Sequence, residues 1–100
     1  MIYTFKDVAD SKTVSSLILY TVKLPSRNLG VIEEVKTLEG YRRQGRATKL
    51  LKQAIEYGRV LGLDCIELTV RQDAPEVQAF YKSLGFTDRM NHAYRLTLKG

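Results

Sequence analysis

Apolar and polar side chains alternate in three runs over roughly the first forty residues of the chain. Ile2–Val8 alternates weakly, whereas Thr13–Leu24 is rich in Val, Ile, Leu, Thr and Tyr. A break at Pro25–Asn28 separates that run from a third one, Leu29–Leu38. A period of two with β-branched and aromatic residues is typical of half-buried strands. Because the connections are short, the three runs predict an antiparallel meander.

A helical period replaces the alternation in the next segment. Apolar or small residues recur on a 3.6-residue stripe at Ala47, Leu50, Leu51, Ala54, Ile55, Gly58 and Leu61. Gly62 follows at the position where a helix commonly ends in a left-handed residue. The pattern therefore predicts a helix that begins near Ala47 and ends at Gly62.

The last third of the chain predicts one strand, one helix and a closing hairpin. Cys65–Arg71 alternates as a strand, and Asp73 with Pro75 gives a helix start signal. The stripe of this helix is Val77, Phe80, Tyr81 and Leu84, and Gly85 closes it. Phe86–Arg89 and Tyr94–Leu98 are predicted to pair around Met90, Asn91 and His92. The order βββαβαββ predicts one α+β domain over residues 1–100, with a mixed sheet and two covering helices.

Composition describes an ordinary soluble globular chain, with 44% hydrophobic and 27% charged residues. No apolar run has the length of a membrane span, and no signal-peptide pattern opens the chain. The single cysteine, Cys65, cannot form an internal disulfide and favours a cytoplasmic location. With one Cys and one His, a metal site is not expected.

The formal net charge of +5 leaves nucleic-acid binding open as a less favoured hypothesis. Five of the sixteen Lys and Arg residues lie between Arg42 and Lys52, directly after the third predicted strand. No pattern of a nucleic-acid-binding module accompanies them. A polyphosphate ligand accounts for this cluster as well as DNA would.

The stretch Arg42–Ala47 contains the most informative residues of the chain. It connects a strand to a helix start, where unpaired N–H groups and the helix dipole favour anions. Gly45 lets the main chain approach a ligand closely, and three arginines surround it. The spacing fits neither the Rossmann fingerprint nor a P-loop. The pattern indicates a phosphate or pyrophosphate site of another kind.

Two motifs of the chain resemble those of the GNAT superfamily of N-acetyltransferases. Arg42, Gly45 and Ala47 match its acetyl-CoA pyrophosphate loop, Arg/Gln-x-x-Gly-x-Gly/Ala. The strand around Ile66–Val70, followed by Ala79–Phe86 ending in Tyr-x-x-Leu-Gly-Phe, is similar to its second signature. The two motifs stand in the family's order and span Val31 to Phe86.

The resemblance implies an acetyl-CoA-dependent transfer of an acetyl group to a primary amine. It implies that the third strand binds the pantetheine arm and that the loop binds the pyrophosphate. The residues expected to bind the cofactor are Val35, Lys36, Thr37, Arg42, Arg43, Gln44, Gly45, Arg46, Ala47 and Thr48. The N–H of Val35 would face the thioester oxygen as an oxyanion donor.

Two residues are candidates for the chemistry. Glu33 is expected on the same face of its strand as Val35 and Thr37, which would direct it toward the reaction centre as a general base. A solvent-facing carboxylate is the alternative for Glu33, and Glu34 is the weaker candidate. Tyr81 matches the family's general acid toward the coenzyme A thiolate, although it also falls on the apolar stripe of its helix.

Two departures from the family pattern bear on the function. The family's usual asparagine seven residues before the tyrosine is Ala74 here, and the strand and helices that normally precede the meander are missing. The acceptor, a protein or peptide lysine or a small amine, is therefore left open. A non-catalytic coenzyme A-binding module stays an alternative. Open sheet edges in so small a domain also predict a homodimer.

Overall fold

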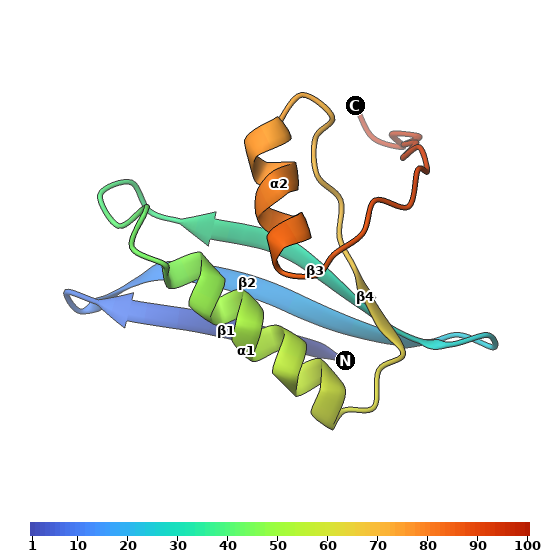
Figure 1. The fold of residues 1–100 in the computed structure, drawn as a ribbon, viewed down its shortest axis with the longest axis horizontal. Coiled ribbons are helices and arrows are strands. Elements are labelled where there is room, and N and C mark those ends of the chain that lie inside the picture. Colours follow the sequence, from blue (N-terminus) through green and yellow to red (C-terminus); the bar gives the residue numbers. More distant parts are fainter. The chain divides into compact units, whose positions relative to one another are not determined.

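The computed structural model describes residues 1–100 as two compact units, Met1–Leu68 and Thr69–Gly100 (Figure 1). The prediction of a single domain is not tested by this division. Each unit is described on its own below.

The first unit contains three antiparallel strands, as the alternation predicts. They are β1 (Ile2–Ala9), β2 (Lys12–Lys23) and β3 (Asn28–Thr37). Asp10 and Ser11 form the first turn, both with positive φ, of 51° and 62°. Such a two-residue turn matches the twist of the strands that it joins.

Helix α1 (Arg46–Val60) and strand β4 (Cys65–Glu67) complete the first unit. The predicted helix is confirmed, and Gly62 has the left-handed φ of 75° expected after its end. The helix packs on the sheet (Figure 1), and β4 returns to pair in parallel with β3, in the sheet order β1-β2-β3-β4. The α+β class with a mixed sheet is confirmed.

The core lies between α1 and the sheet. Its buried apolar side chains are Val14, Leu17, Leu19, Leu29, Ile32, Leu50, Leu51 and Ala54. Gly58 lets the helix come close, because a Cβ at this position would lie 2.9 Å from Ile66 Cδ1. The polar Ser15 is also buried, and its hydroxyl donates to Lys36 O at 3.0 Å.

Strand β4 is shorter than the predicted Cys65–Arg71. Its parallel pairing with β3 stops at Val31 and Glu67. Past this point β3 contains a bulge, and a bulge bends and twists the strand that carries it. The prediction is therefore wrong for the second half of this strand.

The second unit contains helix α2 (Pro75–Ser83), with Pro75 in its first turn as predicted. Gln78 Nε2 donates to the carbonyl of Arg71 at 2.9 Å and to that of Gln72 at 3.0 Å. Gly85, with φ of 102°, follows the end of the helix. Neither helix of the protein is long and apolar enough to cross a membrane.

The closing hairpin is absent, so the predicted order βββαβαββ is wrong in its last two strands. Neither Phe86–Arg89 nor Tyr94–Leu98 forms a strand. Tyr94, Leu96 and Leu98 are 92%, 84% and 88% exposed. Alternation favours a strand only where a partner accepts its hydrogen bonds and a surface buries its apolar side, and this segment has neither.

Candidate functional site

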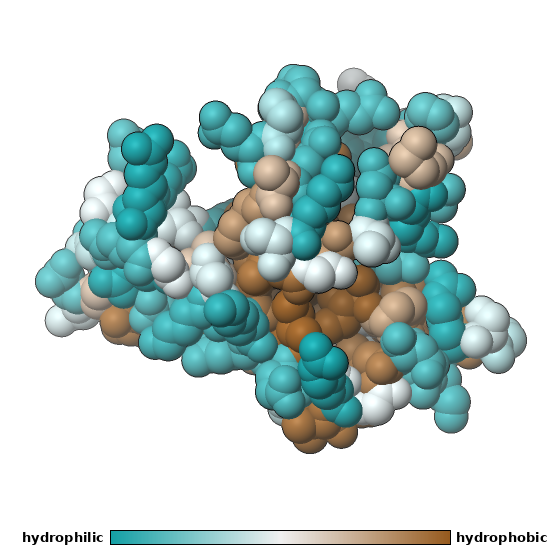
Figure 2. All heavy atoms as spheres, in the orientation of Figure 1, coloured by the Kyte–Doolittle hydropathy of each residue, from teal (hydrophilic) through white to brown (hydrophobic).

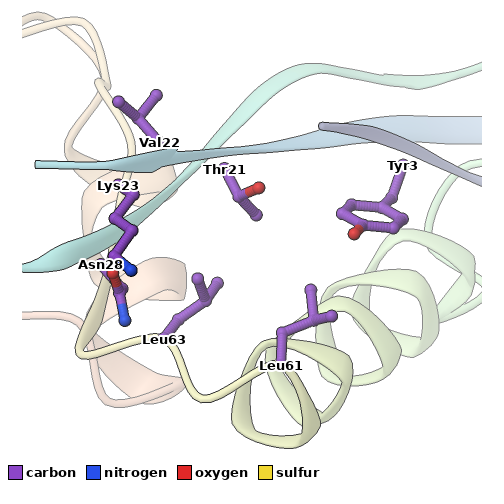
Figure 3. A pocket seen from close by; sticks show the side chains of 7 residues that line it. All are labelled: Tyr3, Thr21, Val22, Lys23, Asn28, Leu61 and Leu63. Atoms are coloured by element: carbon purple, nitrogen blue, oxygen red, sulfur yellow. The ribbon is translucent and has the colours of Figure 1, made fainter.

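The loop between β3 and α1 has the backbone geometry of an anion site. Gly40, Arg43 and Gly45 all have positive φ, of 91°, 61° and 72°. A left-handed residue next to ordinary ones turns successive N–H groups toward one side, which forms an anion-binding concavity. Gly45 is also the N-cap of α1, and no atom lies within 4 Å of where its Cβ would be. Hydrophilic residues gather over this loop in Figure 2.

The first turn of α1 leaves N–H groups available to a ligand. Lys49 N donates to Gly45 O at 3.0 Å and is the first N–H that the helix itself uses. The preceding N–H groups of Arg46, Ala47 and Thr48 have no backbone acceptor. No side chain caps this end and no acidic residue lies in the first turn. The positive end of the helix dipole therefore faces open space.

A groove of about 510 Å³ runs from the end of β3 to this loop. It is lined by Val35, Lys36, Thr37, Leu38, Glu39 and Arg42. Leu38 N donates to Val14 O at 2.8 Å, so the N–H and C=O of the adjacent residue, Thr37, point to the opposite side, away from β2. On that side Arg42 Nε donates to Thr37 O at 3.2 Å. Four of the ten predicted cofactor residues thus line one groove.

The other predicted cofactor residues follow directly along the chain. Arg43, Gln44 and Gly45 are exposed, and Arg46, Ala47 and Thr48 are half-buried at the start of α1. The structure brings all ten residues into one unit. Their contacts with a cofactor stay a prediction.

A bulge in β3 changes the direction of its side chains. Ile18 of β2 pairs with Glu33, whereas Ser16, two residues earlier, pairs with Lys36. β3 therefore contains one extra residue between these two pairs. Glu34 lies in this stretch with φ of 54°, a left-handed value that is uncommon for a residue other than glycine.

The bulge makes the prediction for the face of Glu33 wrong. Because paired residues share a face, Glu33 and Lys36 lie on one side of the sheet. Thr37, which follows Lys36, lies on the other side, and the alternation places Val35 with Thr37. The prediction assumed an unbroken alternation. Glu33 is exposed and makes no ion pair.

Tyr81 lies on α2, in the second unit. Its ring makes edge contacts with Phe80 and Phe86, at centroid distances of 5.2 and 5.8 Å. Burial raises the pKa of the Tyr81 hydroxyl above its ordinary value of 10.0. Burial thus favours the neutral, protonated form of this hydroxyl.

The remaining reactive residues have ordinary surroundings. Cys65 is half-buried in β4, and His92 is exposed but does not lie in the predicted hairpin. Ala74 is the N-cap of α2 and supplies no side-chain cap. The neighbouring Asp73 is held by Arg71 through two hydrogen bonds, of 3.0 and 2.9 Å. No group of three His, Cys, Asp or Glu residues is arranged to hold a metal ion.

The sequence analysis missed the residues that hold the site in place. Ser15 Oγ contacts Thr37 Oγ1 at 2.9 Å and so fixes the end of β3. Asp7 and Asp10, on and beside β1, contact Arg46 and Tyr41 of the loop. These pairs are 22 to 39 residues apart in the chain. No local pattern could have indicated them.

Comparisons with known proteins agree with this geometry. The family model of the acetyltransferase (GNAT) family matches residues 5–86. No curated protein matches the sequence.

Solved structures of acetyltransferases have the same fold. One from Trypanosoma brucei is 26% identical, with a TM-score of 0.84 over 97% of this chain and 69% of its own. An aminoglycoside acetyltransferase from an uncultured soil sample is 22% identical, with a TM-score of 0.84 over 98% of this chain and 66% of its own.

A third structure contains a coenzyme A derivative. It is AAC(6')-Iy in complex with the bisubstrate analogue CoA-S-monomethyl-acetylneamine, 17% identical, with a TM-score of 0.78 over 96% of this chain and 69% of its own. The chain spans about two thirds of the length of these relatives. Since the family model covers most of the sequence and includes both motifs, the chain belongs to the acetyltransferase (GNAT) family.

Proposed function

We propose that the protein binds acetyl-CoA and transfers its acetyl group directly to a primary amine. The observation that carries this proposal is the groove along β3 and its continuation into the loop before α1. The β3 end of the groove presents strand backbone to the extended pantetheine arm. The loop end presents the uncapped N–H groups of α1 and several arginines to the phosphates. Both lie in the first unit, so the binding surface does not depend on the second.

In this proposal each segment of the groove and loop binds a different part of the cofactor. The pantetheine arm lies along Val35, Lys36 and Thr37, with the N–H of Val35 toward the thioester oxygen. The pyrophosphate lies on the N–H groups between Arg43 and Thr48. Arg42 uses only its Nε for Thr37 O, which leaves its two terminal nitrogens for phosphate oxygens.

Acetyl transfer also needs a base and an acid. An amine with a pKa near ~10.4 is mostly protonated at neutral pH and must lose a proton before it attacks. We keep Glu33 as the candidate base and propose that it acts through water, because its exposed carboxylate lies beside the bulge on the side of the sheet opposite Thr37. Tyr81, whose hydroxyl is protonated, donates a proton to the departing thiolate as the C–S bond breaks. This assignment requires the second unit to place Tyr81 at the thioester.

The acceptor is a protein or peptide lysine or a small amine. Two of the relatives named above, the soil enzyme and AAC(6')-Iy, are respectively an aminoglycoside acetyltransferase and a protein bound to an acetylneamine derivative. Because the names of these relatives refer to small amines, we keep a small amine beside a protein or peptide lysine as the acceptor. We also keep the cytoplasm as the expected location, on the ground of the single Cys65.

One observation favours a non-catalytic coenzyme A-binding module as the second candidate. Ala74 begins α2 without any capping side chain. The second unit also contains no buried residue that would fix Tyr81. Thiol release with a panel of amines separates this candidate from the enzyme, because a binding module binds acetyl-CoA without releasing thiol.

Two glycines provide a matched test of the binding surface. Gly45 and Gly62 have nearly equal φ, of 72° and 75°, and a Cβ at either position meets no atom within 4 Å. Valine at either position forces a left-handed conformation that costs about 1–2 kcal/mol. Gly45→Val should weaken acetyl-CoA binding at least ~10-fold by calorimetry, since ~1.4 kcal/mol is tenfold. Gly62→Val should leave the affinity unchanged, and equal losses would refute the site.

A further inference from the structure

The side chain of Arg46 is already engaged within the protein. Its Nη1 donates to Asp7 Oδ2 at 2.9 Å, and its Nε donates to Gln44 Oε1 at 2.8 Å. The Arg46 and Asp7 side chains are only 25% and 14% exposed, so solvent screens this ion pair less than a surface pair. Two of the five N–H donors of this guanidinium are thus engaged, and together these bonds fix its position and direction.

Tyr41 forms a second contact between the loop and the β1–β2 hairpin, after the ion pair of Arg46 with Asp7. Its hydroxyl donates to Asp10 Oδ2 in the turn of that hairpin. The guanidinium carbon of Arg46 and the ammonium nitrogen of Lys12 each lie 5.4 Å from the centroid of the Tyr41 ring. Both distances fit cation–π contacts. Tyr41 and Arg46 are thus fixed to one hairpin and to each other.

The segment between Tyr41 and Arg46 is the one that would contact phosphate. Arg42–Gly45 is exposed and contains two of the left-handed residues, Arg43 and Gly45. A free loop would lose conformational entropy when it ordered around a ligand, and a loop that is already fixed avoids this cost. Tyr41 and Arg46 lie at the two ends of this segment and fix both ends to the β1–β2 hairpin.

We propose that Asp7, Asp10, Tyr41 and Arg46, here called the loop anchor, hold the phosphate loop in its binding conformation. In this role Arg46 is a positioning residue, and its guanidinium is not a phosphate ligand. Arg42 and Arg43 are then the arginines that contact the cofactor. The inference rests on the proposed function, since it concerns the same loop.

Because Asp7 is negatively charged, the direction in which Asp7→Asn changes acetyl-CoA affinity is the first test. Removing a carboxylate near a polyanion should strengthen binding by Coulomb's law alone. It should also strengthen binding if the released Arg46 turned to the phosphates. The loop anchor predicts the opposite, namely that Asp7→Asn weakens acetyl-CoA binding about tenfold because order is lost. Unchanged or tighter binding in calorimetry would overturn the proposal.

A double-mutant cycle separates positioning from direct contact. Arg46→Gln and Asp7→Asn remove the same ion pair, so the double variant should bind acetyl-CoA no more weakly than either single one. If the Arg46 guanidinium bound phosphate, Arg46→Gln would cost affinity in the Asp7→Asn background as well. Additive losses would therefore count against the loop anchor. Arg42→Gln serves as the reference for a phosphate ligand, with losses that add to those of Asp7→Asn.

Backbone dynamics test the loop anchor without any ligand. In the ligand-free full chain, Asp7→Asn and Tyr41→Phe should lower the NMR order parameters of the backbone amides of residues 41–46. Glu56→Gln is the control, because it removes a carboxylate from an exposed pair with Arg59 on the same unit. Equal order parameters in wild type and both anchor variants would refute the ordering role. Failure of wild type to bind acetyl-CoA would instead refute the proposed function, and the order-parameter result would still stand.

Discussion

The two units of the protein differ in how their functional residues are held. In Met1–Leu68 the phosphate loop joins β3 and α1, which contribute five of the eight buried apolar side chains of this unit. In Thr69–Gly100 no residue is fully buried, and Tyr81 is held by two neighbouring aromatic rings. The residues proposed to bind are thus part of the core-bearing unit. Tyr81, the residue proposed to donate the proton, lies outside that unit.

This difference means that cofactor binding and the proton donation proposed for Tyr81 have separate structural supports. A change in the core of the first unit alters the free energy of unfolding and, with it, the shape of the groove. A change at Tyr81 removes a hydroxyl without affecting any buried contact of the core. The comparison therefore predicts that a change at Tyr81 alters turnover without altering stability or affinity.

The largest effect is expected for stability. Leu51→Ala removes a fully buried side chain between α1 and the sheet and should cost about 2–5 kcal/mol in the free energy of unfolding. Leu96→Ala makes the same chemical change at a side chain that is 84% exposed and should cost less than about 0.5 kcal/mol. Urea unfolding followed by circular dichroism measures both. Similar losses would mean that the second unit has a core that the structure does not show.

Tyr81→Phe should lower turnover by ~10²-fold or more and leave acetyl-CoA affinity nearly unchanged, because only the proton donor is lost. Burial raises the pKa of Tyr81, so the phenol stays protonated up to at least its ordinary value of 10.0. Wild-type activity should therefore show no loss from Tyr81 ionisation below about pH 10. Tyr94→Phe, at an exposed tyrosine of the same unit, is the matched control. Full activity in Tyr81→Phe would make it a packing residue.

The sequence predicted the regular elements of the first unit because their signals are local. Alternation located β1 to β3, and the apolar stripe with Gly62 located α1 and its end. The loop motif, together with the family resemblance, indicated the ten residues that the structure brings into one unit. Each of these signals depends on residues within a few positions of one another.

The failed predictions depend on contacts between distant segments. The bulge at Glu34 depends on how β3 aligns with β2, and it reversed the predicted face of Glu33. The strand predicted for Tyr94–Leu98 had the right alternation but found no partner. The loop anchor joins Asp7 to Arg46 across 39 residues. Periodicity contains no information about such pairings.

The smallest effect is expected for Glu33, the candidate base, whose predicted face on β3 was wrong. Glu33→Gln should lower activity ~10-fold at neutral pH and recover partly at high pH, where the amine loses its proton unaided. This loss lies below the usual range of ~10²–10⁴ because an exposed carboxylate competes with water for the same proton. Glu34→Gln, at the adjacent bulge residue, should change the pH–rate profile little. A Glu33→Gln loss that is equal at every pH would mean that this carboxylate does not remove the proton. A pH-dependent loss of activity in Glu34→Gln alone would identify Glu34 as the base.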